Sequence, residues 1–457
     1  MRRSIPAFRL PVETLDSEID AILRMGVDVR YGTPVTSLRA LLAEGFDAVF
    51  VGSGAPRGKE LYLPGRWEEA PDDPHIHIGL DWLQSIAFGH VDAIGERVLV
   101  IGVGNTAMDC CRSSLRLGAN EVTVVARRPR AFFKASPWEL EDAEDEGVEI
   151  LVNHAPRRFV VEDGRLTGME FDVLEWDERA TVSKVVGSVV LPCTDVVVAI
   201  GQENAFPWIE QGLGVDVGDG DLPAVDATTM QSTLPGVFFG GDGAFGPKNI
   251  ITAVAHAHEA AISIHAHCQG RSVTDRPAIG MNLVSQKMGM SQWSYSNDYD
   301  AVARQRMDQA ELARRFERLD QEVELGFTAD KTLREVQRCL NCDVQTTFEA
   351  SLCIECDACI DVCPTACLTI TANGDEPDLR KRLTIPAANT TQDLFVSGGL
   401  PQTGRVMVKD EDVCVHCGLC AERCPTAAWD MQRLELTLPR ATGPAPVRII
   451  SATEARQ

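Results

Sequence analysis

CIECDACIDVCP at residues 353–364 and CVHCGLCAERCP at residues 414–425 are two copies of one pattern, Cys-x-x-Cys-x-x-Cys-x-x-x-Cys-Pro. Two-residue spacers let a short loop place three thiolates around one face of a metal cluster, and this spacing is typical of iron–sulfur ligands. The proline after the fourth cysteine turns the chain away from the loop. The duplication therefore predicts a pseudo-symmetric pair of cluster-binding loops.

A cubane cluster takes four thiolates, and in two-cluster proteins the fourth comes from the other copy. We therefore expect two 4Fe–4S clusters in an α+β domain of the bacterial ferredoxin type. One cluster is expected to use Cys353, Cys356, Cys359 and Cys424, and the other Cys414, Cys417, Cys420 and Cys363. The alternatives are paired zinc sites or a relic without clusters, and a complete set of ligands disfavours both.

Three further cysteines in this region have no assigned ligand role. Cys339 and Cys342 form a Cys-x-x-Cys pair, and Cys367 aligns with Ala428 of the second copy. The two expected clusters do not need any of them. Whether they bind a further metal stays open at this point.

A dinucleotide-binding turn is predicted before the cysteine runs. Gly102-Val-Gly-Asn-Thr-Ala107 follows a predicted buried strand over 97–102 and opens a predicted helix over 105–117. In such a turn the first glycine allows a tight bend, the second lets the backbone approach a pyrophosphate, and the helix N-terminus offers free N–H groups. The residues expected at the pyrophosphate are Gly102, Gly104, Asn105 and Thr106.

The end of the next predicted strand, over 121–126, distinguishes between nicotinamide cofactors. An NAD site places an acidic residue there, whereas this chain has Arg127 and Arg128. Two guanidinium groups suit a 2′-phosphate because they can bind it through charge-assisted, bidentate hydrogen bonds. The pair predicts NADPH as the nucleotide, and the alternative is an exposed basic pair on a loop.

Composition limits the classes of partner. The chain has 457 residues, 15 cysteines and a formal net charge of −24. Such a charge makes nucleic acid and anionic membranes poor partners. An uninterrupted apolar run of about 18 residues, as a membrane span needs, is missing, and the N-terminus lacks the apolar region of a secretory signal. Because most cysteines have metal-ligand spacing, we expect a reducing compartment, the cytoplasm.

Four stretches of the first part of the chain resemble a known family. They are residues 5–11 (IPAFRLP), 102–109 (GVGNTAMD), 126–128 (ARR) and 240–242 (GGD). Over about residues 1–270 the chain resembles the small (β) subunit of NADPH-dependent glutamate synthase and the electron-input half of dihydropyrimidine dehydrogenase. A multidomain variant of that family carries a fused ferredoxin.

The resemblance implies an α/β flavoprotein with two Rossmann-like dinucleotide-binding domains, the FAD domain being interrupted by the NADPH domain. It implies flavin contacts from Gly54, Gly241 and Asp242, with Ile250 opening the following helix and Arg9 as a weaker candidate. The family's FAD domain normally begins with its own Gly-x-Gly-x-x-Gly, and none precedes Ile5. We therefore expect an N-terminally incomplete FAD domain. Either a missing segment or a separate chain completes it, or flavin is not bound.

The expected domains follow from these assignments. They are a partial FAD domain (1–75), an NADPH domain (76–190), the second half of the FAD domain (191–270), a connector (271–338), the ferredoxin-like domain (339–435) and a tail (436–457). Local patterns also predict a strand over 27–31, a capping box from Ser136 to Glu139 and a charged helix near 301–323. The histidines of the helix near 251–267 are expected to be surface or packed residues.

The expected activity is the transfer of electrons from NADPH through FAD and two clusters to a protein acceptor or subunit, or the reverse. No side chain has to act as an acid or base, so no catalytic residue is predicted. The alternative is a non-enzymatic iron–sulfur subunit of a larger complex, such as a 2-oxoacid:ferredoxin oxidoreductase. The terminal acceptor, the direction of electron flow and the oligomeric state stay open.

Overall fold

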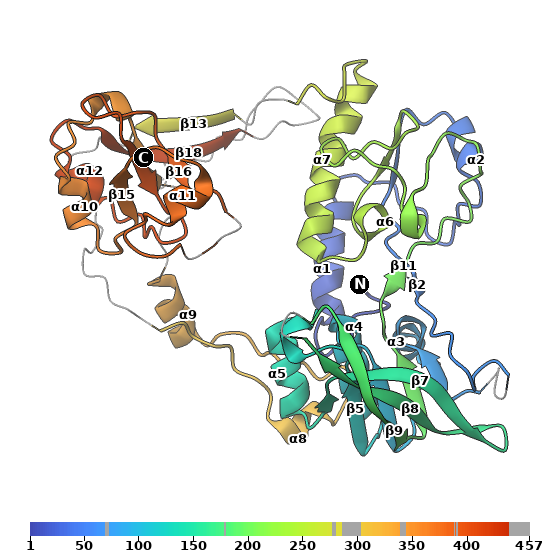
Figure 1. Ribbon diagram of the computed structural model, residues 1–457. Coiled ribbons are helices and arrows are strands. Elements are labelled where there is room, and N and C mark those ends of the chain that lie inside the picture. Colours follow the sequence, from blue (N-terminus) through green and yellow to red (C-terminus); the bar gives the residue numbers. More distant parts are fainter. Residues whose placement is uncertain are drawn as a thin grey trace. The chain divides into compact units, whose positions relative to one another are not determined.

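The computed structural model describes residues 1–68, 73–177, 180–276, 280–285, 303–338, 344–387, 389 and 392–437. The chain divides into two compact units (Figure 1). The first is formed by Met1–Arg276 and Met307–Gly326, and the second by Pro277–Arg306 and Phe327–Gln457. Each unit has hydrophobic cores of its own.

The centre of the first unit is a five-stranded parallel sheet of order β3-β10-β4-β5-β6. Its strands are β3 (Ile76–Ile78), β10 (Asp195–Val198), β4 (Arg97–Ile101), β5 (Glu121–Val125) and β6 (Glu149–Leu151). The helices that connect them are α3 (Gly79–Ala87), α4 (Asn105–Arg116) and α5 (Pro137–Asp145), with a 3-10 turn at Arg130–Phe132. The valine- and isoleucine-rich strands suit a sheet covered on both faces. The βαβαβ unit expected from the sequence is present.

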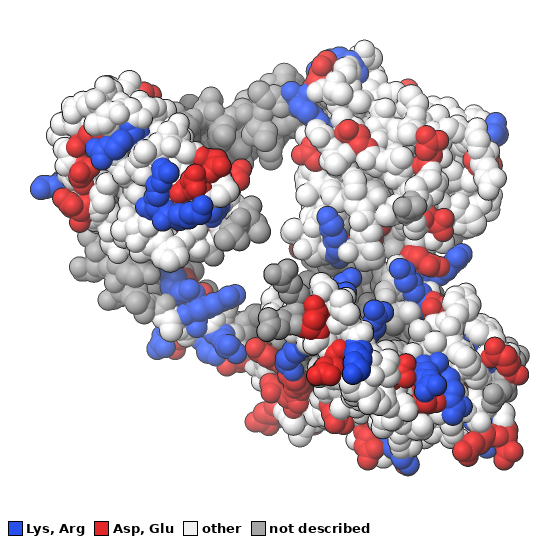
Figure 2. Space-filling model, in the orientation of Figure 1, with Lys and Arg blue, Asp and Glu red and all other residues white. Residues whose placement is uncertain are grey.

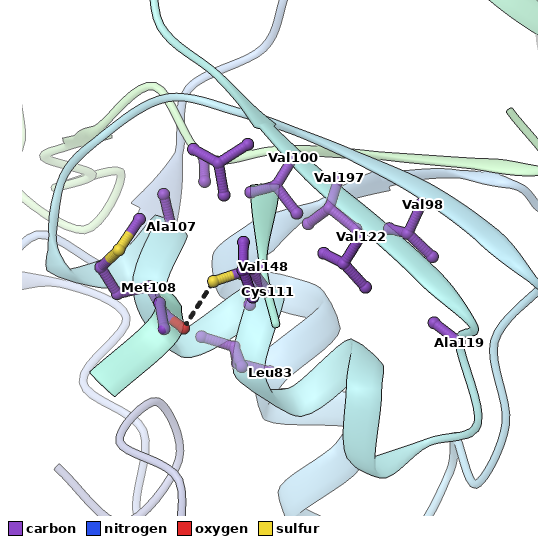
Figure 3. Packing of buried hydrophobic residues seen from close by; sticks show 14 of the residues in the cluster. Leu83, Val98, Val100, Ala107, Met108, Cys111, Ala119, Val122, Val148 and Val197 are labelled. Atoms are coloured by element: carbon purple, nitrogen blue, oxygen red, sulfur yellow. Dashed lines mark hydrogen bonds between the residues drawn. The ribbon is translucent and has the colours of Figure 1, made fainter. Parts of the chain in front are cut away.

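The core under α4 shows why this helix lies close to the sheet. Figure 3 shows Val100 of β4, Val122 of β5 and Val197 of β10 packed near the helix. Ala107 in the first turn of α4 is fully buried, and its small side chain lets the helix approach β4. The Cys111 thiol donates a hydrogen bond to the Met108 carbonyl oxygen at 3.2 Å, so this buried thiol has a hydrogen-bond partner within its own helix (Figure 3).

A three-stranded antiparallel sheet of order β7-β8-β9 covers part of the parallel sheet. Its strands are β7 (His154–Glu162), β8 (Arg165–Trp176) and β9 (Ser183–Pro192). Asp163 and Gly164, both with positive φ, form the two-residue turn between β7 and β8. Positive φ at both turn residues matches the twist of a tight hairpin.

The remainder of the first unit combines segments that precede and follow the five-stranded sheet along the chain. β1 (Val49–Val51) pairs in parallel with β12 (Val237–Phe239), and β2 (Arg57–Gly58) pairs with β11 (Gln202–Glu203). The helices here are α1 (Val12–Leu23), α2 (Leu38–Ala43), α6 (Asp242–Phe245) and α7 (Ile250–Cys268), and Asp219–Asp221 forms a 3-10 turn. Segments that precede and follow the five-stranded sheet along the chain are therefore paired with each other here.

Two local predictions about this unit are wrong. Residues 27–31 form no strand, because Val27 and Tyr31 are 52% and 79% exposed and alternation without burial does not stabilise a strand. The charged helix predicted near 301–323 is reduced, within the described residues 303–323, to α8 (Leu312–Arg315). The Ala310 N–H donates instead to the Val323 carbonyl at 2.8 Å, and the Val323 N–H donates to the Phe8 carbonyl at 3.2 Å.

The second unit is built from two three-stranded antiparallel sheets of order β13-β18-β14 and β15-β17-β16. The strands are β13 (Gly280–Ser285), β14 (Val344–Phe348), β15 (Leu368–Thr371), β16 (Phe395–Val396), β17 (Val406–Lys409) and β18 (Trp429–Thr437). The helices are α9 (Ala329–Val336), α10 (Ala358–Val362), α11 (Glu376–Arg380) and α12 (Leu419–Arg423), with a 3-10 turn at Ala350–Leu352. α10 and α12 occupy equivalent positions in the two cysteine runs. The segment between the runs has a small core of its own around Leu379 and Leu394.

Charges are mixed over the visible surface. On the face shown in Figure 2, the lysines and arginines of the described residues are interspersed with aspartates and glutamates. No helix within the described ranges combines the length and the apolar character that crossing a bilayer requires.

An ion network joins α4 to α5. Arg112, 1% exposed, reaches Glu146 at 2.8 Å and Asp142 at 3.2 Å. Arg116 reaches the other Glu146 oxygen at 2.7 Å. Burial raises the pKa of Glu146, but hydrogen bonds from Arg116 and Arg112 outweigh it and lower that pKa to about 2. Glu139 is part of this network at 3.3 Å from Arg112, so it does not close the predicted capping box with Ser136.

Replacement of Glu146 by Gln is expected to destabilise the first unit by roughly 2–3 kcal/mol at pH 7, because two buried guanidinium groups lose their shared counter-charge. A folded-state pKa lowered from 4.5 gives stability that is present above pH 4.5 and is lost as pH falls toward about 2. Urea unfolding at several pH values should show this loss in the wild type and not in Glu146→Gln. The control is Glu144→Gln, two residues earlier in the last turn of α5 and partly exposed; equal effects of the two variants would contradict the account.

Candidate functional site

Two cavities of the second unit contain the cysteines of the repeat. The first is lined by Cys353, Cys356, Cys359 and Cys424. The second is lined by Cys414, Cys417, Cys420 and Cys363. The structure therefore brings the eight cysteines together in the two groups that crossing fourth ligands require.

The backbone of each cysteine loop is shaped alike and directs N–H groups at sulfur. Glu355 and Asp357 in the first loop have positive φ, as do the equivalent His416 and Gly418 in the second. The Glu355 N–H donates to the Cys353 sulfur at 3.4 Å, and the His416 N–H donates to Cys414 at 3.4 Å. Such donors stabilise thiolates and tune cluster potentials.

Each cavity also has a buried nitrogen without a hydrogen-bond partner among the described residues. They are Nε1 of Trp429 beside the first cavity and Nδ1 of His416 in the second loop. Buried donors usually have partners. Burial raises the pKa of the Cys359 thiol to about 11. Four sulfurs with an unpartnered buried nitrogen near each group fit a 4Fe–4S cluster, whose sulfides accept hydrogen bonds.

Cys367 adjoins the second cavity. Its sulfur lies 3.5 Å from that of Cys363 and is buried. Hydrogen bonding from Cys367 lowers the pKa of Cys363 to about 5 and that of Cys414 to about 6. Cys367 therefore lies within hydrogen-bond distance of an expected ligand, Cys363. Cys339 and Cys342 lie outside the described residues.

The turn after β4 has the geometry that a pyrophosphate needs. Gly102 has φ +125°, and a Cβ there would lie 2.3 Å from the Ala199 carbonyl oxygen, so only glycine fits. A Cβ on Gly104 would meet no atom within 4 Å. Gly104 caps α4 without a side-chain hydrogen bond, which leaves first-turn N–H groups open to an anion. Asn105 accepts a hydrogen bond from the Ser136 N–H at 2.9 Å, and Thr106 lies 3.5 Å from the Gln202 amide.

Arg127 and Arg128 lie at the same edge of the sheet as this turn. β4 and β5 are parallel and in register, with Ile101 opposite Val125, so both strands end at one edge. The two guanidinium groups are exposed and lie 5.9 and 5.8 Å from the centre of the Trp176 ring. The Trp176 indole donates to the Arg127 carbonyl at 3.1 Å, which holds the ring in place.

The glycine-rich turns after β1 and β12 also meet. The two strands are parallel, and a Cβ on Gly243 would lie 3.3 Å from the Gly54 carbonyl oxygen. Gly241 has φ +65° and donates its N–H to Nδ1 of His256 at 3.1 Å. Asp242 accepts from the Lys248 N–H at 3.0 Å. Beside this turn, Oδ1 of Asn204 is buried without a partner among the described residues, so the surroundings fit a polar ligand.

Comparison with known proteins identifies the first unit. The family model described as pyridine nucleotide-disulphide oxidoreductase matches residues 8–260. The chain belongs to this family. A second model, described as a 4Fe-4S dicluster domain, matches residues 352–428. These matches confirm the predicted fold class, a Rossmann-like flavoprotein fold followed by a ferredoxin-type domain.

Two curated proteins are similar to this chain. The NADPH-Fe(3+) oxidoreductase subunit beta of Geobacter sulfurreducens is 32% identical over 372 residues, which are 74% of this chain and 55% of that protein. The NADP(+)-dependent formate dehydrogenase subunit beta of Moorella thermoacetica is 34% identical over 354 residues, 74% of this chain and 48% of that protein. The chain thus spans about half the length of these relatives.

Among solved structures, the chain is similar to Mycobacterium tuberculosis FprA in complex with NADPH, with a TM-score of 0.47 and 18% identity. The alignment covers 59% of this chain and 75% of FprA.

Two contacts in this family member were not anticipated from its sequence. Arg9, a candidate flavin contact by resemblance, pairs with Asp109 of α4 at 2.7 Å and with Glu139. His256, expected to be a surface or packed histidine, holds the Gly241 turn. A histidine on a predicted helix carries no local signal for such a bond, since its partner lies in another element.

The predicted cofactor-binding residues nevertheless gather at three places. Gly102, Gly104, Asn105 and Thr106 form the turn after β4, and Arg127 and Arg128 follow β5. Gly54, Gly241 and Asp242 lie at the edge formed by β1 and β12, and Ile250 opens α7.

Proposed function

We propose that this chain is part of an NADPH-dependent flavin and iron–sulfur oxidoreductase, which passes electrons from NADPH through FAD and two 4Fe–4S clusters to an acceptor protein, or in the reverse direction. The observation that carries the proposal is the grouping of the eight repeat cysteines, four in each of two cavities, in the same chain as a dinucleotide turn. Family membership and the dicluster match support it.

The residues of the turn after β4 would hold the nucleotide. The open N–H groups of α4 would bind the pyrophosphate, and Arg127 and Arg128 would bind the 2′-phosphate. Trp176 keeps the chain carrying these arginines in position. NADPH is favoured over NADH because this strand end offers two cations and no carboxylate.

The turns that contain Gly54 and Gly241 would hold FAD, with Asp242 accepting hydrogen bonds and α7, which Ile250 opens, directed toward the pyrophosphate. When bound, FAD would supply the exchange between hydride and single-electron transfer. The eight cysteines would hold two clusters, which would supply one-electron transfer when bound. No acid or base from the chain is needed.

A further subunit is part of the proposal. Two relatives carry the word "subunit" in their names, which supports a redox partner for this chain. A separate chain or further segment would complete the FAD-binding region, whose sheet within the described residues has two strands. The cysteine runs favour a reducing compartment, the cytoplasm.

A visible spectrum of the full chain, reconstituted anaerobically with iron, sulfide and FAD, tests this function. We expect flavin bands that NADPH bleaches and NADH bleaches poorly. A broad cluster absorbance that NADPH leaves unchanged, with no flavin retained, would contradict the oxidoreductase and favour a non-enzymatic electron-transfer subunit.

A further inference from the structure

The two cysteine cavities are related by the sequence repeat but differ at several lining positions. Most residues of one have a counterpart in the other, such as Thr365 and Thr426. At three of the positions that differ, the second cavity has Lys409, Cys367 and Leu368, and the first has Phe348, Ala428 and Trp429. The ligand sets are equivalent, whereas their surroundings are not.

Lys409 brings a buried cation to the second cavity. The residue is 1% exposed, although lysine is among the residues least often buried. Its ammonium donates to the Thr346 hydroxyl at 2.9 Å and pairs with Glu411 at 2.9 Å. A Glu411 oxygen, the Cys414 sulfur and a His416 nitrogen all lie within 4.8 Å of one another. The ammonium is thus held beside the second group of sulfurs.

The first cavity has aromatic rings at the corresponding side. Phe348 and Trp429 lie with ring centres 4.8 Å apart. Within the described lining of this cavity the charged side chain is Asp357, which is exposed. Glu355 of the same loop is paired with Arg405 at 2.9 Å. No lysine or arginine occurs among these lining residues.

Burial decides which of these charges affects a cluster. Exposed charges such as Asp357 are screened by water and salt, whereas a charge in the low-dielectric interior is screened much less. The negative charge of Glu411 opposes the positive charge of Lys409, but the Glu411 side chain is 31% exposed whereas that of Lys409 is 2% exposed. The buried ammonium of Lys409 therefore makes a positive contribution at the second group of sulfurs that has no counterpart among the described lining residues of the first cavity.

We propose that Lys409 makes the cluster of Cys363, Cys414, Cys417 and Cys420 the one with the higher reduction potential, so that the first electron entering the module settles there. Reduction adds one electron to a cluster and moves no atom, and a nearby cation stabilises the added charge. The inference rests on the proposed two-cluster function and assigns a role to each cluster within it.

The test is an EPR-monitored reduction of the full chain with dithionite to one electron per chain. The variants Cys424→Ala and Cys363→Ala, each keeping one cluster under the proposed wiring, identify the two signals. We expect the wild type to show the signal that Cys424→Ala retains. Lys409→Met should change the ratio of the two reduced clusters about tenfold in favour of the other cluster, which is equivalent to about 59 mV for one electron. Glu411→Gln should shift it the opposite way.

The matched control is Lys381→Met, which removes an exposed lysine directly after α11 in the same unit. An electron found on the other cluster in the wild type, or a distribution that neither Lys409→Met nor Glu411→Gln changes, would overturn the inference while leaving the proposed function intact. Should Lys409→Met fail to fold, the partly exposed Glu411 variant still decides. A chain without iron after reconstitution would overturn the proposed function itself, and the inference with it.

Discussion

Replacement of Cys424 by Ala is expected to remove the cluster of the first cysteine run and to leave that of the second. Although Cys424 belongs to the second run in sequence, its side chain lines the cavity of Cys353, Cys356 and Cys359. A cubane that loses one of its four thiolates is left with an open iron site. Iron should fall from about eight to about four atoms per chain, by chemical iron and sulfide assay.

The equivalent substitution in the other repeat is Cys363→Ala, which should remove the cluster of the second run. The matched control is Cys367→Ala, a buried cysteine of the same region that has alanine as its counterpart in the other repeat. This control should retain about eight iron atoms. Loss of the second-run signal in Cys424→Ala would show that the ligands do not cross between the runs.

Removal of both guanidinium groups in Arg127→Ala/Arg128→Ala is expected to abolish the preference for NADPH. A charge-assisted hydrogen bond contributes about 1.5–3 kcal/mol to binding. Because both arginines are exposed to solvent, we expect their combined contribution to be about 2–3 kcal/mol. This corresponds to a roughly 30- to 150-fold fall in kcat/KM for NADPH. The value for NADH should change little, since NADH has no 2′-phosphate. Flavin reduction in a stopped-flow instrument measures both.

The chain offers a matched control for this double variant. Arg157 and Arg158 are adjacent, half-exposed arginines on β7 that pair with Glu170. Their replacement by alanine removes the same charge without touching the strand end after β5. Equal losses in the two double variants would mean that long-range attraction, and not a 2′-phosphate site, sets the preference.

The features predicted from the sequence are those in which a short stretch determines its own geometry. Gly102 is required by one close approach, to the Ala199 carbonyl, and its role is visible in the six residues around it. The cysteine spacing in each run likewise fixes three sulfurs of one loop. The crossing fourth cysteine could be predicted because the repeat itself implies pseudo-symmetry.

The features that the sequence did not reveal depend on partners distant along the chain. Arg112 has its carboxylates 27 to 34 residues away, and Lys409 binds Thr346 across 63 residues. The charged stretch near 301–323 has helical character, but tertiary hydrogen bonds between Ala310, Val323 and Phe8 replace most of the helix. Local propensity cannot anticipate such long-range pairs.

The central claim is that electrons from NADPH reach the clusters of this chain. Anaerobic addition of NADPH to the reconstituted full chain, followed by freezing and EPR, tests it most directly. The account predicts the signal of a reduced 4Fe–4S cluster, and its absence in the Arg127→Ala/Arg128→Ala variant at the same low NADPH concentration. Clusters that dithionite reduces but that stay oxidised after NADPH has bleached the flavin would contradict it.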